Sequence, residues 1–232
     1  MTFDIFPLEN HFEKLSGIHL INRNLINGTC ACIILLLRHI KPTHKVNILK
    51  AKITSLAQGS SEFYAVNIHA TAFATDDTKQ QHIDKYVETL AVINDGGDLF
   101  VTGGDLNSVP PGSITDFCES DMCVGEDYHT EAAEEYHKEG SYFENFDGEP
   151  DILLPLYSVY NSAIDSSEAN LPNHCTHGPS TSFEMNNIKY DRKLDYLFTN
   201  GSWVTDAAQT HQGAWELSDH MPVSSKLNFG GE

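Results

Sequence analysis

Residues 99–110 read LFVTGGDLNSVP and combine a short apolar run with two glycines, Asp105 and Asn107. Leu99–Thr102 has the short apolar pattern of a buried β-strand, and the turn-forming sequence NDGG precedes it at residues 94–97. Two glycines then lead directly to Asp105 and Asn107, and two prolines close the segment. An ordinary strand does not end in this way, so strand formation alone does not account for the Gly-Gly-Asp-X-Asn sequence.

The segments before this stretch alternate between strand and helix. Residues 45–54 and 62–70 have the pattern of neighbouring strands joined by a polar turn around residues 58–60. From Asp76 to Ile93 the apolar spacing changes to i, i+3, i+4 and i+7, which predicts an amphipathic helix. The order strand, helix, strand favours an α/β layered domain. The apolar positions of this helix are Ile83, Tyr86, Val87 and Leu90, its N-cap is Thr75 or Asp76, and Gly96-Gly97 is its stop.

The second half of the chain contains an acidic excursion at about residues 112–187. We predict a helix around residues 126–139, followed by a long irregular loop that ends near Asn187. A loop of this length inside a compact domain usually serves as a lid or a binding feature. Two further strands are predicted at residues 193–200 and 222–229, and residues 1–232 are predicted to form a single domain.

The charge balance argues against a protein that grips a long phosphate backbone. The chain has 14 Lys and Arg residues against 33 Asp and Glu residues, a formal net charge of −19. The acidity is concentrated between Asp116 and Asp151, where Lys138 is the sole lysine or arginine. Nucleic acid is therefore disfavoured as a partner, although it is not excluded.

The cysteines and apolar runs indicate little about the compartment. Cys118 and Cys123 are close enough in sequence for a small disulfide, and reduced thiols are the equal alternative for all five cysteines. The longest apolar run, residues 30–37, is too short to span a bilayer and follows no basic segment. We expect no transmembrane segment and no signal peptide in this chain, and a secreted origin stays open if a leader once preceded it.

Chemically reactive groups lie where the predicted strands stop. Carboxylates with a carboxamide suit a hard cation such as Mg²⁺ or Mn²⁺, and histidines suit proton transfer near neutral pH. Together these groups match what phosphodiester hydrolysis requires: charge neutralisation, a base for water and donors for the transition state. The residues are His69 in VNIHA, Asp105 and Asn107 in GGDLN, Asp195 in RKLDYLF, and Asp219 and His220 in LSDHMPV.

Each fragment also has an ordinary structural explanation. His69 alone is more often a satisfied histidine at a strand end, GDLN is a common turn, and SDH can be a helix cap. Asp195 is harder to explain in this way, because a carboxylate among apolar strand residues needs a partner.

The four fragments in this order resemble the endonuclease/exonuclease/phosphatase superfamily. That superfamily includes pancreatic-type deoxyribonuclease, abasic-site endonucleases, neutral sphingomyelinases and inositol polyphosphate 5-phosphatases. It is marked by a strand ending in His, a Gly-Asp-X-Asn strand end, an Asp-Tyr strand and Ser-Asp-His before a final strand. Here these motifs are NIHA, GGDLN, KLDY and LSDHMPV, within roughly residues 45–229.

The resemblance implies a fold and a metal site. The fold is an α/β four-layer α/β/β/α sandwich, with two mixed β-sheets packed face to face. Asp105 and Asn107 would bind metal and the scissile phosphate, and the glycines before them would let the backbone turn tightly so that both face the phosphate. Asp219 and His220 complete the implied metal ligands.

The resemblance also implies roles in proton transfer. His220 would be the general base that activates water, or part of that relay, and Asp195 would orient a catalytic histidine and stabilise its charge. Asp219 would support the metal or His220, and His69 would donate to the phosphate or act as an acid.

The first two motifs of the superfamily are absent. Its members open with a strand bearing an Asn, followed by a Gln-Glu pair whose Glu is the principal metal ligand. This chain opens with MTFDIFPLENHFEKLSGIHLINRN, where Glu9 or Glu13 is the alternative carboxylate. By this resemblance the fold is N-terminally incomplete, by a piece of about fifty or more residues. Without the principal glutamate we expect Mg²⁺ to bind much more weakly.

Three functions follow as hypotheses. The first is a metal-dependent phosphoesterase acting on a small or lipid-linked ester, the second an inactive member kept as a binding module, and the third a nuclease. A zinc site at His174, Cys175 and His177 is a separate idea, although no second ligand pair has the spacing of a zinc site. Further substrate contacts would come from the aromatic residues Tyr142, Phe143, Phe146, Tyr157 and Tyr160, or from Asn22, Arg23 and Asn24; packing and a surface turn are the alternatives.

Overall fold

The computed structural model describes residues 4–7, 18–21, 47–54, 62–72, 77–113, 149–178, 190 and 192–229. Several predicted features fall outside these residues, among them the helix at 126–139, the Cys118–Cys123 pair, Glu9 and Glu13, Asn22–Asn24, and the aromatic residues Tyr142, Phe143 and Phe146. Among the described residues, no helix is long and apolar enough to cross a lipid bilayer.

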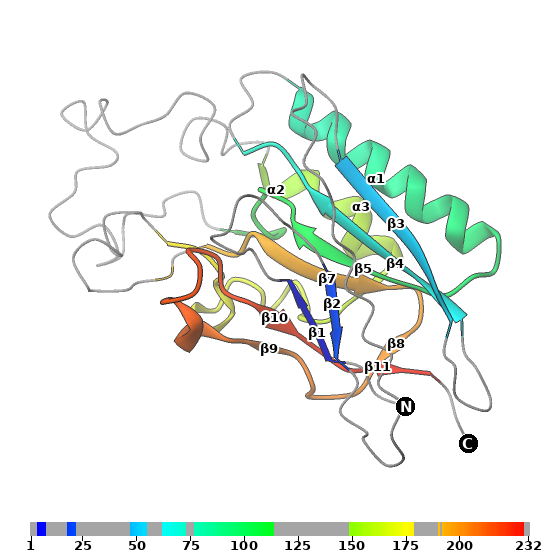
Figure 1. Cartoon of the computed structure of the whole chain (residues 1–232). Helices are drawn as coiled ribbons and strands as arrows, with labels where there is room; N and C mark the ends of the chain where they lie inside the picture. Colours follow the sequence, from blue (N-terminus) through cyan, green and yellow to red (C-terminus); the bar gives the residue numbers. More distant parts are fainter. Residues whose placement is uncertain are drawn as a thin grey trace, which may run out of the picture.

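A mixed five-stranded sheet forms the centre of the α/β fold (Figure 1). In spatial order the strands are β3 (Asn47–Thr54), β4 (Glu62–His69), β5 (Phe100–Asp105), β7 (Asp195–Thr199) and β6 (Asn161–Ser162). Strand β4 pairs in parallel with β5, and β5 pairs antiparallel with β7. The outer strands β3 and β6 pair antiparallel with β4 and β7, respectively.

Helix α1 (Thr78–Asp95) makes the parallel crossover from β4 to β5. Its predicted apolar face is confirmed, because Ile83, Tyr86 and Leu90 are completely buried. The helix begins after Asp77, whose side chain makes no capping hydrogen bond, and it ends at Gly96 as predicted. The candidate N-caps Thr75 and Asp76 lie outside the described residues.

One face of the sheet packs against α1 and α3 (Leu154–Val159). Alternate strand residues such as Ile68, Phe100 and Phe198 point to this face and are fully buried. The ring of Tyr160 meets Phe100 edge-on, with centroids 5.0 Å apart.

Residues 149–178 are far more regular than the predicted irregular loop. They contain α2 (Glu149–Ile152), α3, β6 and the 3₁₀ helix η4 (Pro172–His174). Apolar residues in and next to α3, such as Leu153 and Leu156, are buried against the sheet, and β6 pairs with β7, so local polarity misled the prediction. Tyr157 and Tyr160 belong to this packing, which confirms the packing alternative for these two aromatic residues.

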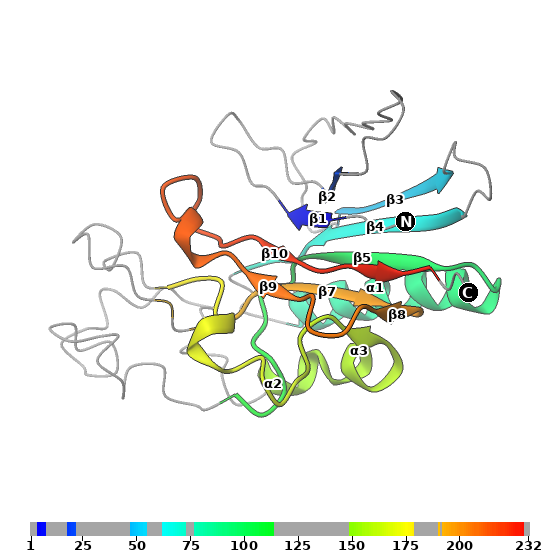
Figure 2. The same cartoon turned by 90° about the horizontal axis from the view of Figure 1, so that it is seen from below.

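The other face of the sheet packs against a layer of short antiparallel pairs (Figure 2). Leu197 and Val101 point to this face and pack with Val223 and Leu227. The predicted strand 222–229 is split in two because its halves pair with different partners. The pairs are β9 (Gln209–Thr210) with β10 (Val223–Ser224), β8 (Ser202–Trp203) with β11 (Leu227–Asn228), and β1 (Asp4–Pro7) with β2 (Ile18–Ile21).

The expected four layers are therefore represented by three in the described residues. Helices, the five-stranded sheet and the layer of short pairs follow one another in Figure 2. Among the described residues, no helix of eight or more residues covers the outer side of the short pairs.

The two glycines of the opening stretch lie inside β5 instead of forming a turn after it. A Cβ atom on Gly103 would lie 2.2 Å from the carbonyl oxygen of Tyr196, and one on Gly104 would lie 2.0 Å from that of Ile68. Gly104 also has φ +133°, which side-chain-bearing residues rarely adopt. The glycines are required because neighbouring strands approach β5 closely, so the prediction of a tight turn was wrong.

Candidate active site

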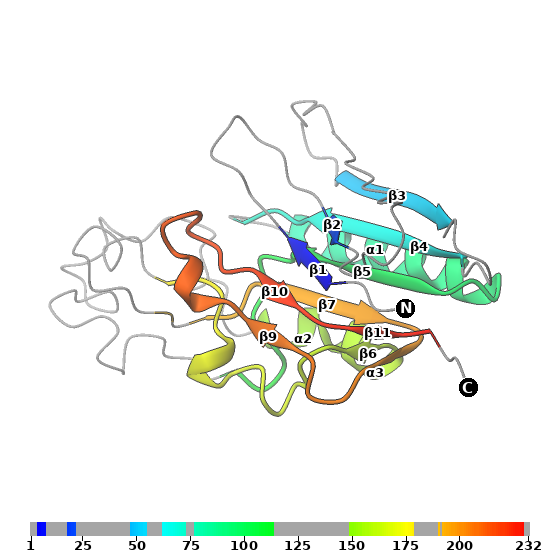
Figure 3. The same ribbon diagram turned by 60° about the horizontal axis from the view of Figure 1, so that its bottom comes forward.

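Three of the predicted site residues form a row across adjacent strands. His69 is the last residue of β4, Asp105 is the last of β5 and Asp195 is the first of β7. The register pairs His69 with Asp105 and Asp105 with Asp195, so the three side chains leave the same face of the sheet. The row lies at the sheet end where β4 and β5 finish and β7 begins (Figure 3).

His220 joins the row from the loop before β10. Its Nδ1 atom lies 2.9 Å from Oδ2 of Asp195, and its Nε2 atom lies 3.9 Å from Oδ2 of Asp105. Because a carboxylate only accepts, Nδ1 donates the hydrogen bond, and the neutral ring carries its lone pair on Nε2. The backbone N–H of His220 donates to the Ser218 hydroxyl at 3.1 Å, which holds the loop in place.

The Asp195 carboxylate is buried and remains ionised. Burial by itself raises the pKa of this group, but the His220 charge and hydrogen bond, the Thr176 hydroxyl and Lys193 together lower the pKa below its usual value. Asp195 is only 4% exposed, so its partners have to supply the stabilisation that water would otherwise give.

Thr176 is a residue that sequence reasoning missed. Its hydroxyl accepts hydrogen bonds from the backbone N–H groups of Leu194 at 2.9 Å and Asp195 at 3.2 Å. Its backbone carbonyl accepts from Met221 at 2.8 Å. Thr176 therefore connects the start of β7 to the loop that carries His220. No local sequence pattern predicts this role.

Asp105 and Asn107 face each other at the end of β5. Oδ1 and Oδ2 of Asp105 accept from the backbone N–H and the amide nitrogen of Asn107, at 2.8 and 2.7 Å. Asn107 has φ 47°, a left-handed conformation that asparagine tolerates better than most residues, and its amide also donates to the Ala70 carbonyl at 3.0 Å. Nε2 of His69 lies 3.4 Å from Oδ2 of Asp105.

Asp219 lies at the exposed side of the cluster, together with His177. Nδ1 of His177 donates to the backbone carbonyl of Asp219 at 3.0 Å. The His177 ring stacks on the His220 ring, with centroids 4.6 Å apart and planes 27° from parallel. Burial, the neighbouring His220 and Arg192 lower the pKa of His177 to about 4, so its ring is neutral near pH 7.

The predicted zinc trio is not gathered into one site in the described part of the chain. The groups that could hold a metal there do not combine His174 with Cys175 and His177. The buried Cys175 thiol instead donates to the Leu171 carbonyl at 3.7 Å. His177 belongs to the Asp219–His220 cluster, which sequence spacing could not show because backbone hydrogen bonds to Arg192 place it there.

The donor atoms of the row fit a hard divalent cation with few protein ligands. Asp105, Asp195 and His220 each offer a ligand atom, all within 4.8 Å of one another. Since Asp195 is engaged by His220, Asp105 is the carboxylate best suited to a cation. One carboxylate, completed by water and substrate phosphate, is within the usual range for Mg²⁺.

No protein-family model and no curated protein matches the chain. Among solved structures it is similar to an endonuclease/exonuclease/phosphatase from Bacteroides vulgatus, with a TM-score of 0.47 and 15% identity over 79% of this chain. It is also similar to the catalytic domain of APE2 from Xenopus laevis, with a TM-score of 0.49 and 16% identity over 78% of this chain. A mannosyl-6-phosphatase from Bacteroides thetaiotaomicron has a TM-score of 0.39 at 14% identity over 73%.

The first of these structures belongs to the superfamily that the four motifs resemble. This chain spans 55% of the length of the first two solved chains and 52% of the third. At these identities the likeness concerns the fold, and a proposal for the activity has to rest on the side chains of this chain.

Proposed function

We propose that the protein is a metal-dependent phosphoesterase. The observation that carries this proposal is the hydrogen-bonded Asp195–His220 pair, which points Nε2 of His220 toward Asp105 in the same row as His69. A base, a hard-oxygen ligand and a second imidazole thus converge on one small volume, which is the combination that hydrolysis of a phosphoester requires.

In this proposal His220 takes the proton from the attacking water. Its lone pair lies on Nε2, because Nδ1 is committed to Asp195. Asp195 holds the ring in this tautomer and stabilises the positive charge that develops when Nε2 accepts the proton.

His69 and Asn107 act on the phosphate side. The His69 ring is 47% exposed and lies beside Asp105, so it can donate to a phosphate oxygen or to the leaving group. Asn107 fixes the Asp105 carboxylate by two hydrogen bonds. The carboxylate therefore loses less conformational entropy when substrate or a cation binds.

Asp105 would hold the divalent cation, with Asn107, Asp219 and His220 as the neighbouring groups that the resemblance assigns to the same task. When bound, Mg²⁺ or Mn²⁺ would neutralise charge on the phosphate oxygens. Since Asp195 is occupied by His220, the described residues offer few carboxylates to the cation. We therefore expect weak cation binding and saturation only at high concentration.

The substrate that fits best is a small or lipid-linked phosphoester. A formal net charge of −19 raises the electrostatic cost of bringing a long polyanion to the surface. An inactive binding module is the second candidate, favoured because Asp195 is engaged by His220 and the described residues leave few carboxylates for a cation.

Hydrolysis of bis-p-nitrophenyl phosphate tests the proposal. Turnover should require Mg²⁺ or Mn²⁺, stop with EDTA and fall at least about 100-fold in Asp105→Asn and His220→Gln. Asp206→Asn is the matched control, because Asp206 is exposed and lies between β8 and β9. Turnover that persists in both site variants would overturn the proposal, and a folded chain without turnover would favour the binding module.

A further inference from the structure

We propose that His177, His220 and Asp219 form a second metal site, one that prefers an imidazole-binding divalent ion of the Zn²⁺ class. The three residues each offer a ligand atom, and these atoms lie within 4.8 Å of one another. Two imidazoles and one carboxylate are the donors that Zn²⁺ and similar ions accept, with a further position open to water. The site differs from the Asp105 site in its additional ligand His177 and in the metal it selects, and it shares with that site Asp219 and His220, which the resemblance assigns there.

The hydrogen bonds of the two histidines support this assignment. Nδ1 of His220 donates to the Asp195 carboxylate, and Nδ1 of His177 donates to the Asp219 carbonyl. Metal-binding histidines in proteins usually donate their second ring N–H to a carboxylate or a backbone carbonyl in this way. Ligation through the Nε2 atoms would leave both of these hydrogen bonds intact.

Backbone contacts hold the two ligand-bearing segments together without a metal. The carbonyl of Thr176 accepts from the Met221 N–H at 2.8 Å, which joins the residues next to His177 and His220. His177 and Arg192 also exchange backbone hydrogen bonds at 3.0 and 3.2 Å, which fixes His177 beside β7. Little conformational entropy is therefore left to lose on metal binding.

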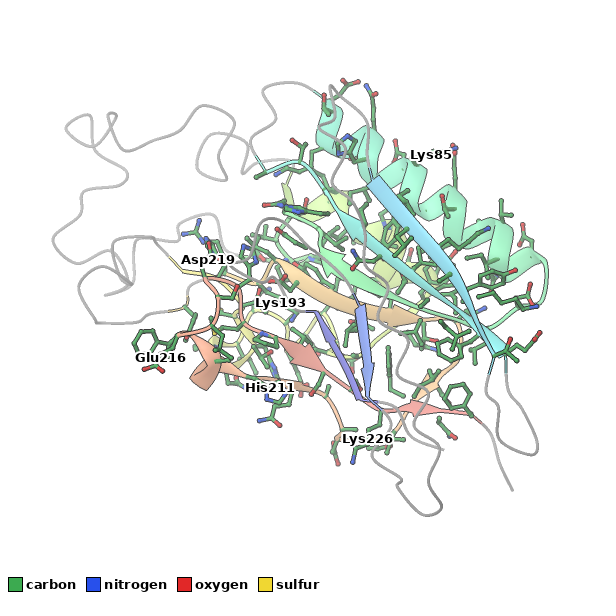
Figure 4. All side chains as sticks on the ribbon, viewed as in Figure 1. Lys85, Lys193, His211, Glu216, Asp219 and Lys226 are labelled. Carbon is green, nitrogen blue, oxygen red and sulfur yellow. The ribbon has the colours of Figure 1, made fainter. Side chains whose placement is uncertain are left out.

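The site is open to an ion from solvent. Asp219 is exposed, and His177 and His220 are partly exposed. Figure 4 shows Asp219 on the loop that runs from Glu216 toward β10, at the same end of the main sheet as Lys193. An entry route, and groups that orient the ligand rings by hydrogen bonds, are two features expected of a real metal site.

Occupation of this site would engage the His220 ring. If His220 is the base of the reaction, as in the proposed function, a Zn²⁺-class ion would inhibit hydrolysis while Mg²⁺ supports it. Metal binding itself can be measured without any turnover, so a failure of the proposed function would leave this proposal testable.

The test is a titration of the full chain with Co²⁺, followed by its visible absorption, and with Zn²⁺ in competition with a colorimetric chelator. We expect two variants to lower the affinity for both Co²⁺ and Zn²⁺ by about 10- to 100-fold. They are His177→Phe, which keeps a ring against His220, and Asp219→Asn. The exposed Asp219 provides a variant that should fold even if His177→Phe does not. Millimolar Mg²⁺ should not displace Co²⁺, because imidazole ligands do not suit Mg²⁺.

His174→Phe and Cys175→Ala are the matched controls, since they remove the neighbouring candidate ligands of the trio His174, Cys175 and His177. Binding should be unchanged in both. The proposal is overturned if either control lowers the affinity for Co²⁺ as much as His177→Phe does. It is also overturned if neither His177→Phe nor Asp219→Asn lowers that affinity, or if Mg²⁺ displaces Co²⁺ from the site.

Discussion

Asp195 shows how much a single carboxylate can organise in this protein. It is buried, it accepts from His220 at 2.9 Å, and its backbone N–H donates to the Thr176 hydroxyl at 3.2 Å. Sequence reasoning could predict that Asp195 needs a partner, because it stands in an apolar strand. It could not show that Thr176 would hold the backbone in place.

Asp195→Asn should reduce kcat by about 10²- to 10⁴-fold with little change in KM. An amide can donate to His220 and so reverse its tautomer, which removes the lone pair from Nε2. The measurement is steady-state hydrolysis of bis-p-nitrophenyl phosphate, with Asp206→Asn as the control. A rise in KM at unchanged kcat would contradict the role of Asp195 in proton transfer.

Lys193 is a buried cation whose desolvation destabilises the fold. It is 2% exposed, its ammonium donates to the His174 carbonyl at 3.5 Å and it lies 5.2 Å from the centroid of the Tyr196 ring. Burial lowers the pKa of Lys193 from 10.5 to about 8, although Asp195 and Cys175 act in the opposite direction. Between these two pKa values the unfolded chain binds more protons, so stability contributed by this group rises with pH.

Lys193→Met should therefore raise the free energy of unfolding at pH 7 by on the order of 1–3 kcal/mol. It should also remove the part of the stability increase that the wild type shows between about pH 8 and pH 10.5. Urea unfolding at several pH values measures both effects, with the exposed Lys226→Met as the control. A less stable Lys193→Met protein at pH 7 would mean that the contacts with His174 and Tyr196 outweigh the cost of burial.

Strand β5 is the element on which the site depends. Its neighbours β4 and β7 approach so closely that Gly103 and Gly104 have no room for a side chain. This approach brings His69 and Asp195 to either side of Asp105. The glycines are thus needed for strand packing. The local sequence indicated a turn and did not predict this role.

Gly104→Ala should destabilise the fold by at least about 3 kcal/mol or prevent folding, since its Cβ would overlap the Ile68 carbonyl and its φ is +133°. Gly213→Ala is the matched control, because a Cβ there meets nothing within 4 Å. Thermal unfolding followed by circular dichroism compares the two. Equal stability of the two variants would contradict the packing explanation.

At the scale of the whole molecule, the charge sets the kind of substrate that can approach. The formal net charge of −19 repels polyanions, and salt screens that repulsion. A protein that grips nucleic acid with a basic surface shows the opposite behaviour, because salt competes with its phosphate contacts.

Between about 50 and 200 mM salt, kcat/KM for bis-p-nitrophenyl phosphate and for a short oligonucleotide should therefore hold steady or rise. Steady-state assays at constant cation concentration measure this dependence. A tenfold or larger fall for the oligonucleotide alone would indicate a basic phosphate-binding surface and would favour the nuclease hypothesis.

Local sequence patterns predict the strands that carry the site, the apolar face of α1 and six candidate residues, because periodicity and strand-end chemistry are local properties. The row that β4, β5 and β7 form with His69, Asp105 and Asp195 could not be predicted in this way, since strand order and register depend on contacts between distant segments. The same holds for the stacking of His177 on His220 and for the packing of residues 149–178 as helices and a strand instead of an open loop. Burial against the sheet supplies the free energy for these arrangements, and no stretch of sequence contains that sheet by itself.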